Sequence, residues 1–123
     1  MKKLTFGTPE KLKPSVFCKD FNYQETAICY PVDQIEYKEN ARGCVLRLPL
    51  GKGEHIYGLG LQLKAFDLRN KKLTLRANAD PVTAAGDSHA PVPFFVSTAG
   101  YGIYVDTARY AEFYFGTAPK NPP

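Results

Sequence analysis

Acidic side chains and a histidine, the residue types that could carry out acid–base chemistry, gather in residues 78–89. Asp80, Asp87 and His89 all lie in this stretch. Two carboxylates are what glycoside hydrolysis requires, one as the acid and one as the nucleophile or base. Both carboxylates belong to one loop, however, and the sequence offers no evident opposite wall, so a self-contained glycosidase is not expected. The spacing alone favours Asx-turns, in which each Asp accepts hydrogen bonds from the local backbone.

The other residues that could bind or react are isolated from one another. His55 lies in an apolar run, which is more typical of a structural histidine than of a general base. Cys18, Cys29 and Cys44 show no C-x-x-C spacing and have no histidine close enough for a zinc site, so we expect neither a metal nor a catalytic thiol. The glycines at 58–60 do not complete a G-x-G-x-x-G motif, so phosphate binding is not indicated. We therefore predict no cofactor.

The length and composition are those of one small globular domain. The chain has 123 residues, of which 44% are apolar and 23% charged, and a chain of this kind can bury a core. Its 8 Tyr, 8 Phe, 10 Gly and 10 Pro residues favour strands separated by turns over a helical bundle. We predict a single domain over residues 1–116, weakly defined over 1–33, and a proline-rich tail or linker over 117–123.

The distribution of charge and cysteine predicts a cytoplasmic protein that binds neither nucleic acid nor a membrane. The net charge is +4, but the basic residues are scattered among acidic ones instead of forming one patch. The residues after Met1 are too polar for a signal peptide, and no apolar stretch is long enough to span a bilayer. An odd number of cysteines without a disulfide framework is typical of reduced thiols.

Hydrophobic periodicity predicts an all-β fold. Apolar and polar residues alternate over 35–37 and over 44–50, around a turn at 40–43, which is the pattern of strands with one buried face. Further strands are expected at 55–57, at 65–68 and 72–77 as neighbours, and at 92–98, 101–106 and 111–115 as three consecutive antiparallel strands. Seven to nine short strands favour an antiparallel β-sandwich, with a barrel as the alternative.

Two local features add detail to this fold. Val92, Phe94 and Val96 occupy alternate positions and are expected to share one face of their strand. The alternating glycines at 58–60 indicate a bend or a close approach of the backbone to a neighbour, and not a helix interior.

Two sequence motifs follow one another in the second half of the chain. Residues 54–60 read EHIYGLG, and residues 91–106 read PVPFFVSTAGYGIYVD. The pair resembles the E-x-x-Y-G-L-G segment, and the P-F strand with its G-Y-G-[IV] hairpin, of the N-terminal domain of glycoside hydrolase family 31. This family includes α-glucosidases and α-xylosidases. The resemblance covers residues 54–116.

The resemblance implies a β-sandwich related to the galactose-mutarotase fold, packed against a catalytic (β/α)₈ barrel that is not in this sequence. In the family, aspartates of the barrel cleave an α-linked sugar substrate by a retaining double displacement. The catalytic residues are therefore expected in the barrel, and this chain is expected to be inactive alone. The loop between the two motifs reaches toward the active-site mouth in family members, which makes Asp80, Asp87 and His89 the expected substrate-binding residues.

A free-standing carbohydrate-binding module and a structural or interaction module are the alternatives. In the first, aromatic residues such as Tyr101, Tyr104 and Tyr110 would stack on sugar rings. Tyrosines at alternating strand positions are more often core residues or cross-strand pairs, which favours the family 31 domain.

Overall fold

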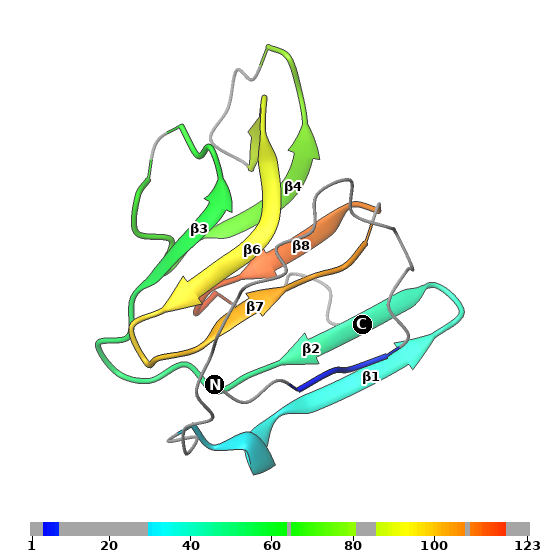
Figure 1. The fold of residues 1–123 in the computed structure, drawn as a ribbon, viewed down its shortest axis with the longest axis vertical. Helices are drawn as coiled ribbons and strands as arrows, with labels where there is room; N and C mark the ends of the chain where they lie inside the picture. The colour runs from blue at the N-terminus through cyan, green and yellow to red at the C-terminus, as the bar shows by residue number, and fades with distance from the viewer. Residues whose placement is uncertain (1–3, 8–29, 64, 81–85, 108, 118–123) are drawn as a thin grey trace, which may run out of the picture. The chain divides into compact units, whose positions relative to one another are not determined.

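The computed structural model describes residues 4–7, 30–63, 65–80, 86–107 and 109–117. Within these residues the regular structure consists of strands and one short 3₁₀-helix, which confirms the predicted all-β class (Figure 1). The elements are η1 (Val32–Gln34), β1 (Glu36–Asn40), β2 (Gly43–Arg47), β3 (Ile56–Gly60), β4 (Lys72–Ala77), β5 (Asp87–Ser88), β6 (Pro91–Ser97), β7 (Gly102–Tyr104) and β8 (Ala111–Tyr114). None of the helical structure in these ranges has the length and apolarity needed to cross a bilayer.

The chain divides into two compact units, residues 1–48 and 49–123. In the first unit β1 and β2 form an antiparallel hairpin whose register places Asn40 opposite Gly43. The side-chain oxygen of Asn40 accepts a hydrogen bond from the Arg42 amide at 2.8 Å, as Asn commonly does in turns. The turn predicted at 40–43 is therefore confirmed.

The described residues of the second unit form two three-stranded sheets. One has the strand order β3-β6-β7 and the other β5-β4-β8, and Figure 1 shows β6 between β3 and β7. The strand pairs of these sheets are antiparallel, except that β4 and the two-residue strand β5 run parallel.

The two sheets cover each other around an apolar core. The buried core residues are Ile56, Leu59, Leu68, Leu73, Leu75, Phe95, Phe113 and Phe115. Phe95 of the first sheet meets Phe113 and Phe115 at ring-centroid distances of 6.1 and 5.0 Å, in the edge-to-face arrangement that aromatic pairs favour. Two sheets packed in this way form the predicted β-sandwich.

The glycines at 58 and 60 allow a bulge in β3. The register with β6 shifts between Gly58 and Gly60, and their φ angles are 134° and 75°. A Cβ atom at Gly60 would lie 2.2 Å from the carbonyl oxygen of Ala90, so a side chain at this position would clash with backbone. The predicted close approach is confirmed, and Leu59 between the two glycines is fully buried.

Two of the predicted strand assignments are wrong. Residues 65–68 form no strand; instead the Leu68 amide donates to the Ile56 carbonyl oxygen at 2.8 Å, and the buried Leu68 side chain closes the core from a loop. Residues 111–115 do not pair with β7, because β8 pairs with β4 in the opposite sheet. Neighbouring strands of a chain often pair, but here the pairing with β4 brings Phe113 and Phe115 against Phe95 across the core.

Val92, Phe94 and Val96 share one face of β6, as predicted, but this is the outer face. All three side chains are exposed, whereas Phe95 between them is buried. Apolar residues occupy both alternating sets of this strand, so periodicity alone could not identify the set that faces the core.

Candidate functional site

The loop predicted to contact substrate is held at its base by three hydrogen-bonded residues, Arg76, Asn78 and Asp87, which we call the Asp87 clamp. Asp87 Oδ2 accepts hydrogen bonds from Arg76 Nη2 at 2.5 Å and from Asn78 Nδ2 at 3.2 Å. Arg76 and Asp87 are partners in the parallel β4–β5 register. The hydrogen bond from Arg76, followed by that from Asn78, lowers the pKa of Asp87 below its ordinary value of 3.8. Asp87 is therefore an ionised acceptor at neutral pH and not a general acid.

Two backbone amides also donate hydrogen bonds at the base of this loop. The Asn78 amide donates to the Ser88 carbonyl oxygen at 2.9 Å, and the Asp80 amide donates to Asn78 Oδ1 at 3.0 Å. Asn78 thus forms an Asx-turn at the start of the loop. Asp87, at the other end, accepts its bonds from side chains.

Asp80 and His89 lie on the two sides of the clamp, and both are exposed. Within the described part of the chain, no hydrogen bond or ion pair joins either residue to Asp87. Residues 81–85 of the loop lie outside the described residues. Substrate contact by Asp80, Asp87 and His89 therefore stays a prediction.

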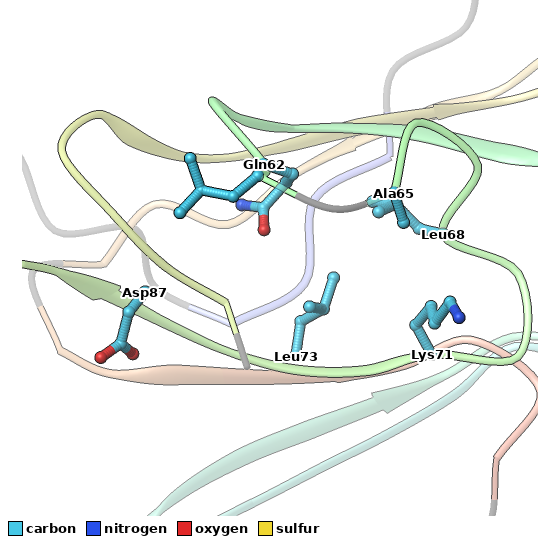
Figure 2. Close-up of a pocket in the computed structure, with 7 residues that line it drawn as sticks. Gln62, Ala65, Leu68, Lys71, Leu73 and Asp87 are labelled. Atoms are coloured by element: carbon cyan, nitrogen blue, oxygen red, sulfur yellow. The ribbon is translucent and has the colours of Figure 1, made fainter. Parts of the chain in front are cut away.

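Asp87 also lines a pocket of about 220 Å³ (Figure 2). The lining residues are Gln62, Leu63, Ala65, Leu68, Lys71, Leu73 and Asp87. Figure 2 shows Asp87 and Lys71 at opposite ends of the pocket, with Leu73 rising between them. Pockets that enclose small ligands usually measure at least about 300 Å³, so a sugar bound here would need a further wall.

A second carboxylate, Glu54, connects the two sequence motifs through buried hydrogen bonds. Glu54 is only 6% exposed. Its Oε1 accepts from Ser97 Oγ at 2.5 Å and from the Tyr101 hydroxyl at 2.7 Å, and its Oε2 accepts from the Gly51 amide at 2.7 Å. Burial raises the pKa of Glu54, but these hydrogen bonds together outweigh it and hold the pKa below the ordinary value of 4.5. Glu54 is therefore an ionised anchor between the start of β3 and the β6–β7 hairpin.

His55 and Asp67 form a pair at the surface beside this anchor. His55 Nδ1 lies 2.5 Å from Asp67 Oδ2, and Asp67 Oδ1 accepts from the Arg69 amide at 3.0 Å. The Arg69 amide, followed by His55, lowers the pKa of Asp67 below 3.8. The pair attaches the loop after β3 to the beginning of that strand, which is the structural role expected of His55.

No group of three or more His, Cys, Asp or Glu side chains that could hold a metal ion occurs in the described ranges. The exposed thiol of Cys44 is a free cysteine.

Sequence reasoning identified Asp87 but missed its partners Arg76 and Asn78, and it missed the role of Glu54. Asn78 and Asp87 stand at the two ends of a run of small residues. This local pattern could have indicated that the two side chains meet at the base of a loop. Glu54 stands directly before an apolar run, and a carboxylate at a buried position needs hydrogen-bond donors. Its donors Ser97 and Tyr101 belong to the second motif, so only the folded chain brings them to Glu54.

A family model matches most of the chain, and known glycosidases are among the proteins similar to it. Residues 10–113 match the glycosyl hydrolase 31 N-terminal galactose mutarotase-like domain. The chain is 32% identical over 71 residues to the alpha-xylosidase XylQ of Lactiplantibacillus pentosus, covering 58% of this chain and 9% of that protein. An alignment of 94 residues with the sulfoquinovosidase of Escherichia coli (strain K12) is 35% identical and covers 61% of this chain and 14% of that protein. The chain thus spans about a tenth of the length of these curated relatives.

Proposed function

The chain belongs to the galactose mutarotase-like N-terminal domain family of glycosyl hydrolase 31, and on this premise we propose that it is the non-catalytic N-terminal domain of a larger retaining α-glycosidase. It packs on a (β/α)₈ catalytic domain of the same protein, which hydrolyses an α-linked sugar. The family match over residues 10–113 carries this proposal, together with the small share of the relatives that the chain spans. The proposal includes a cytoplasmic location, which the free thiol of Cys44 supports.

The state of the described carboxylates supports a non-catalytic role. A retaining glycosidase needs two carboxyl groups about 5 Å apart that flank the scissile bond, one of which must be protonated to act as the acid. Glu54 is enclosed by three hydrogen bonds, and Asp87 is held by Arg76. The pKa of each lies below its ordinary value, so neither is suited to be the acid.

We assign the loop that contains Asp80, Asp87 and His89 to the rim of the catalytic domain's substrate pocket. The Asp87 clamp fixes the base of the loop, while Asp80 and His89 are exposed and available to a ligand. The pocket beside Asp87 is too small to enclose a sugar by itself. A second wall from the catalytic domain would complete it.

Kinetics of the parent enzyme test the loop assignment. We expect Asp80→Asn and His89→Ala each to lower kcat/KM about tenfold, because a lost substrate contact weakens transition-state binding. The substrates are an α-xyloside, a sulfoquinovoside and an α-glucoside, the first two chosen from the relatives. Asp33→Asn, an exposed acid of η1, is the matched control. If both loop variants keep wild-type kinetics on short and extended substrates, the loop does not belong to the site.

The isolated chain tests the non-catalytic role. We expect residues 1–123 alone to hydrolyse none of these three substrates above the uncatalysed rate. Turnover by the isolated chain would overturn this part of the proposal.

A carbohydrate-binding module is the second candidate, because two tyrosines are largely exposed. The exposed fractions of Tyr104 and Tyr110 are 63% and 75%. Tyr101, in contrast, donates to Glu54 and packs against Phe95 at a ring-centroid distance of 6.5 Å, so it contributes to the core. Calorimetric titration of the isolated chain with maltose, xylosides and galactosides separates the two functions, since micromolar affinity would favour the module.

A further inference from the structure

The outer face of the β3-β6-β7 sheet is apolar. Val92, Phe94 and Val96 of β6 point away from the core and are 42–46% exposed. Tyr104 of β7 lies opposite Phe94, and Tyr57 of β3 lies opposite Val96. Residues that are directly opposite in an antiparallel pair point to the same side. We call these five residues the β6 face.

An aromatic side chain from a loop extends this surface. The Phe66 ring lies 5.0 Å from the Tyr57 ring, centroid to centroid, and Phe66 is 85% exposed. Large contiguous apolar surfaces on soluble domains mark places where another molecule or domain binds.

The outer face of the β4–β8 pair is charged, so the apolar character belongs to one side of the sandwich. Lys72 Nζ lies 3.1 Å from Glu112 Oε1 and 5.1 Å from the centroid of the Tyr114 ring. Arg76, on the same face of β4, pairs with Asp87. Paired and solvated charges are stable in water. The side chains of the β6 face, in contrast, gain free energy when they are covered.

We infer that the β6 face is the surface on which the catalytic domain of the parent glycosidase packs. This assignment rests on the proposed function and adds to it the location of the contact. The chain covers 9% of the alpha-xylosidase and 14% of the sulfoquinovosidase to which it is similar, so in such proteins most of the mass is linked to this domain. A linked domain is present at a high effective concentration, whereas a second copy of the chain must come from solution.

The composition of the β6 face favours a protein partner over a sugar. Val92 and Val96 offer neither an aromatic ring for stacking nor a group that hydrogen-bonds to hydroxyls. Aliphatic and aromatic side chains together are typical of the buried centre of permanent interfaces. The hydroxyl groups of Tyr57 and Tyr104 suit the edge of such an interface, where one end of the ring stays wet.

Val96→Lys tests the assignment, with Thr74→Lys on the charged face as the matched control. Each variant places a lysine on an outward, β-branched strand position, which is exposed at Val96 and half-buried at Thr74, where the hydroxyl donates to Glu112 Oε1 at 3.3 Å. In the parent enzyme we expect Val96→Lys to lower the Tm by about 5 °C or more, because a lysine buried in the interface lacks a partner. We also expect it to lower kcat/KM about tenfold, since the domain would no longer hold its loop at the pocket. Thr74→Lys should change neither quantity.

The same two variants of the isolated chain provide the second measurement. Both should unfold at the wild-type temperature, because their lysines stay in water. A clear loss of stability in isolated Val96→Lys would overturn the assignment, since the face would then be covered within the chain itself.

The remaining outcomes separate this assignment from the proposed function. An unchanged Tm of the Val96→Lys parent enzyme would overturn the assignment alone, as long as the wild-type parent hydrolyses α-glycosides. A wild-type parent without that activity would overturn the proposed function. Dimerisation of the isolated chain that Val96→Lys abolishes, measured by sedimentation, would assign the face to a second copy. Sugar binding that Val96→Lys abolishes would assign it to a carbohydrate.

Discussion

Glu54 and Asp87 are both carboxylates held by several hydrogen bonds, yet they lie in different surroundings. Glu54 is 6% exposed and accepts from three uncharged donors, on Ser97, Tyr101 and Gly51. Asp87, whose own side chain is 11% exposed, accepts from the guanidinium of Arg76, which is 49% exposed and can be solvated at the base of the loop.

The surroundings decide what each carboxylate does. A buried donor or acceptor that loses its partner costs free energy because water cannot replace the partner. When Asp87 is lost, water can solvate the half-exposed Arg76, so we expect a smaller loss of stability. We therefore expect Glu54 to control folding of the second unit and the Asp87 clamp to control the order of its loop.

The largest difference should appear when the two carboxylates are removed. Glu54→Ala leaves the donors of Ser97, Tyr101 and Gly51 without an acceptor, so we expect it to lower the free energy of unfolding by about 3 kcal/mol. Asp87→Ala should lower it much less, because Arg76 stays solvated. Urea denaturation of the two variants measures both values. Equal losses of stability would remove the distinction between buried anchor and surface clamp.

Protonation of Glu54 at low pH should also destabilise the domain. Its folded pKa lies below the ordinary value of 4.5, so its contribution to stability is complete above that value and is lost as the pH falls through the folded pKa. We expect the stability of the wild-type chain to decline below about pH 4.5 more steeply than that of Glu54→Gln. The control is Asp87→Asn, which should keep the wild-type decline between about pH 4.5 and 3.8, because the contribution of Asp87 is lost mainly below its ordinary pKa of 3.8. Parallel pH profiles for wild type and Glu54→Gln would contradict the role of Glu54.

A single donor to Glu54 should have a smaller effect. Tyr101→Phe keeps the ring beside Phe95 and removes only the hydroxyl that donates to Glu54, so we expect a loss of about 1 kcal/mol. Thermal unfolding measures it, and Tyr104→Phe, whose tyrosine is exposed, is the control with no expected change. A loss as large as that of Glu54→Ala would mean that Tyr101 alone holds the anchor.

Weakening the clamp should affect the loop without unfolding the domain. Asp87→Asn removes the charge that holds Arg76, so we expect the amides of Asn78 and Asp80 to exchange hydrogen several-fold faster through local opening. The Ile56 and Phe95 amides of the core should exchange at the wild-type rate. Faster exchange throughout the second unit would show that Asp87 belongs to the folding core.

Salt should produce the smallest effect. At about 1 M NaCl the Debye length is about 3 Å, which screens exposed charges but not buried hydrogen bonds. We expect exchange of the Asn78 amide to accelerate slightly, while the Gly51 amide bonded to Glu54 keeps its rate. Equal sensitivity of both amides would place Glu54 and Asp87 in the same kind of environment.

Most strands could be predicted from the sequence, because alternation of side chains is a local property. The β1–β2 hairpin and its turn, and the close approach at Gly58 and Gly60, followed from neighbouring residues alone. The pairing of β8 with β4 could not be predicted in this way. It depends on the contact of Phe113 with Phe95 across the core, and these residues belong to different sheets. The buried face of β6 was also beyond local patterns, since that strand is apolar on both sides.

The candidate site also has features that the sequence shows and features that only the structure shows. Its loop and its titratable residues were visible in the sequence as a cluster of acids, a histidine and small residues. The partners of Asp87 and Glu54 were not, since Arg76 and Asn78 lie 11 and 9 residues from Asp87, and Ser97 and Tyr101 lie 43 and 47 residues from Glu54.

The sequence by itself determined the all-β class, the positions of most strands and turns, and the two motifs that indicate the family. These depend on residue type and short-range spacing, which the chain carries before it folds. The tertiary structure decided which apolar side chains are buried, which carboxylate is an anchor and which a clamp, and that the exposed apolar residues of β6 form one face. Burial and partner choice depend on residues far apart in the chain, and only the packed sheets bring those residues together.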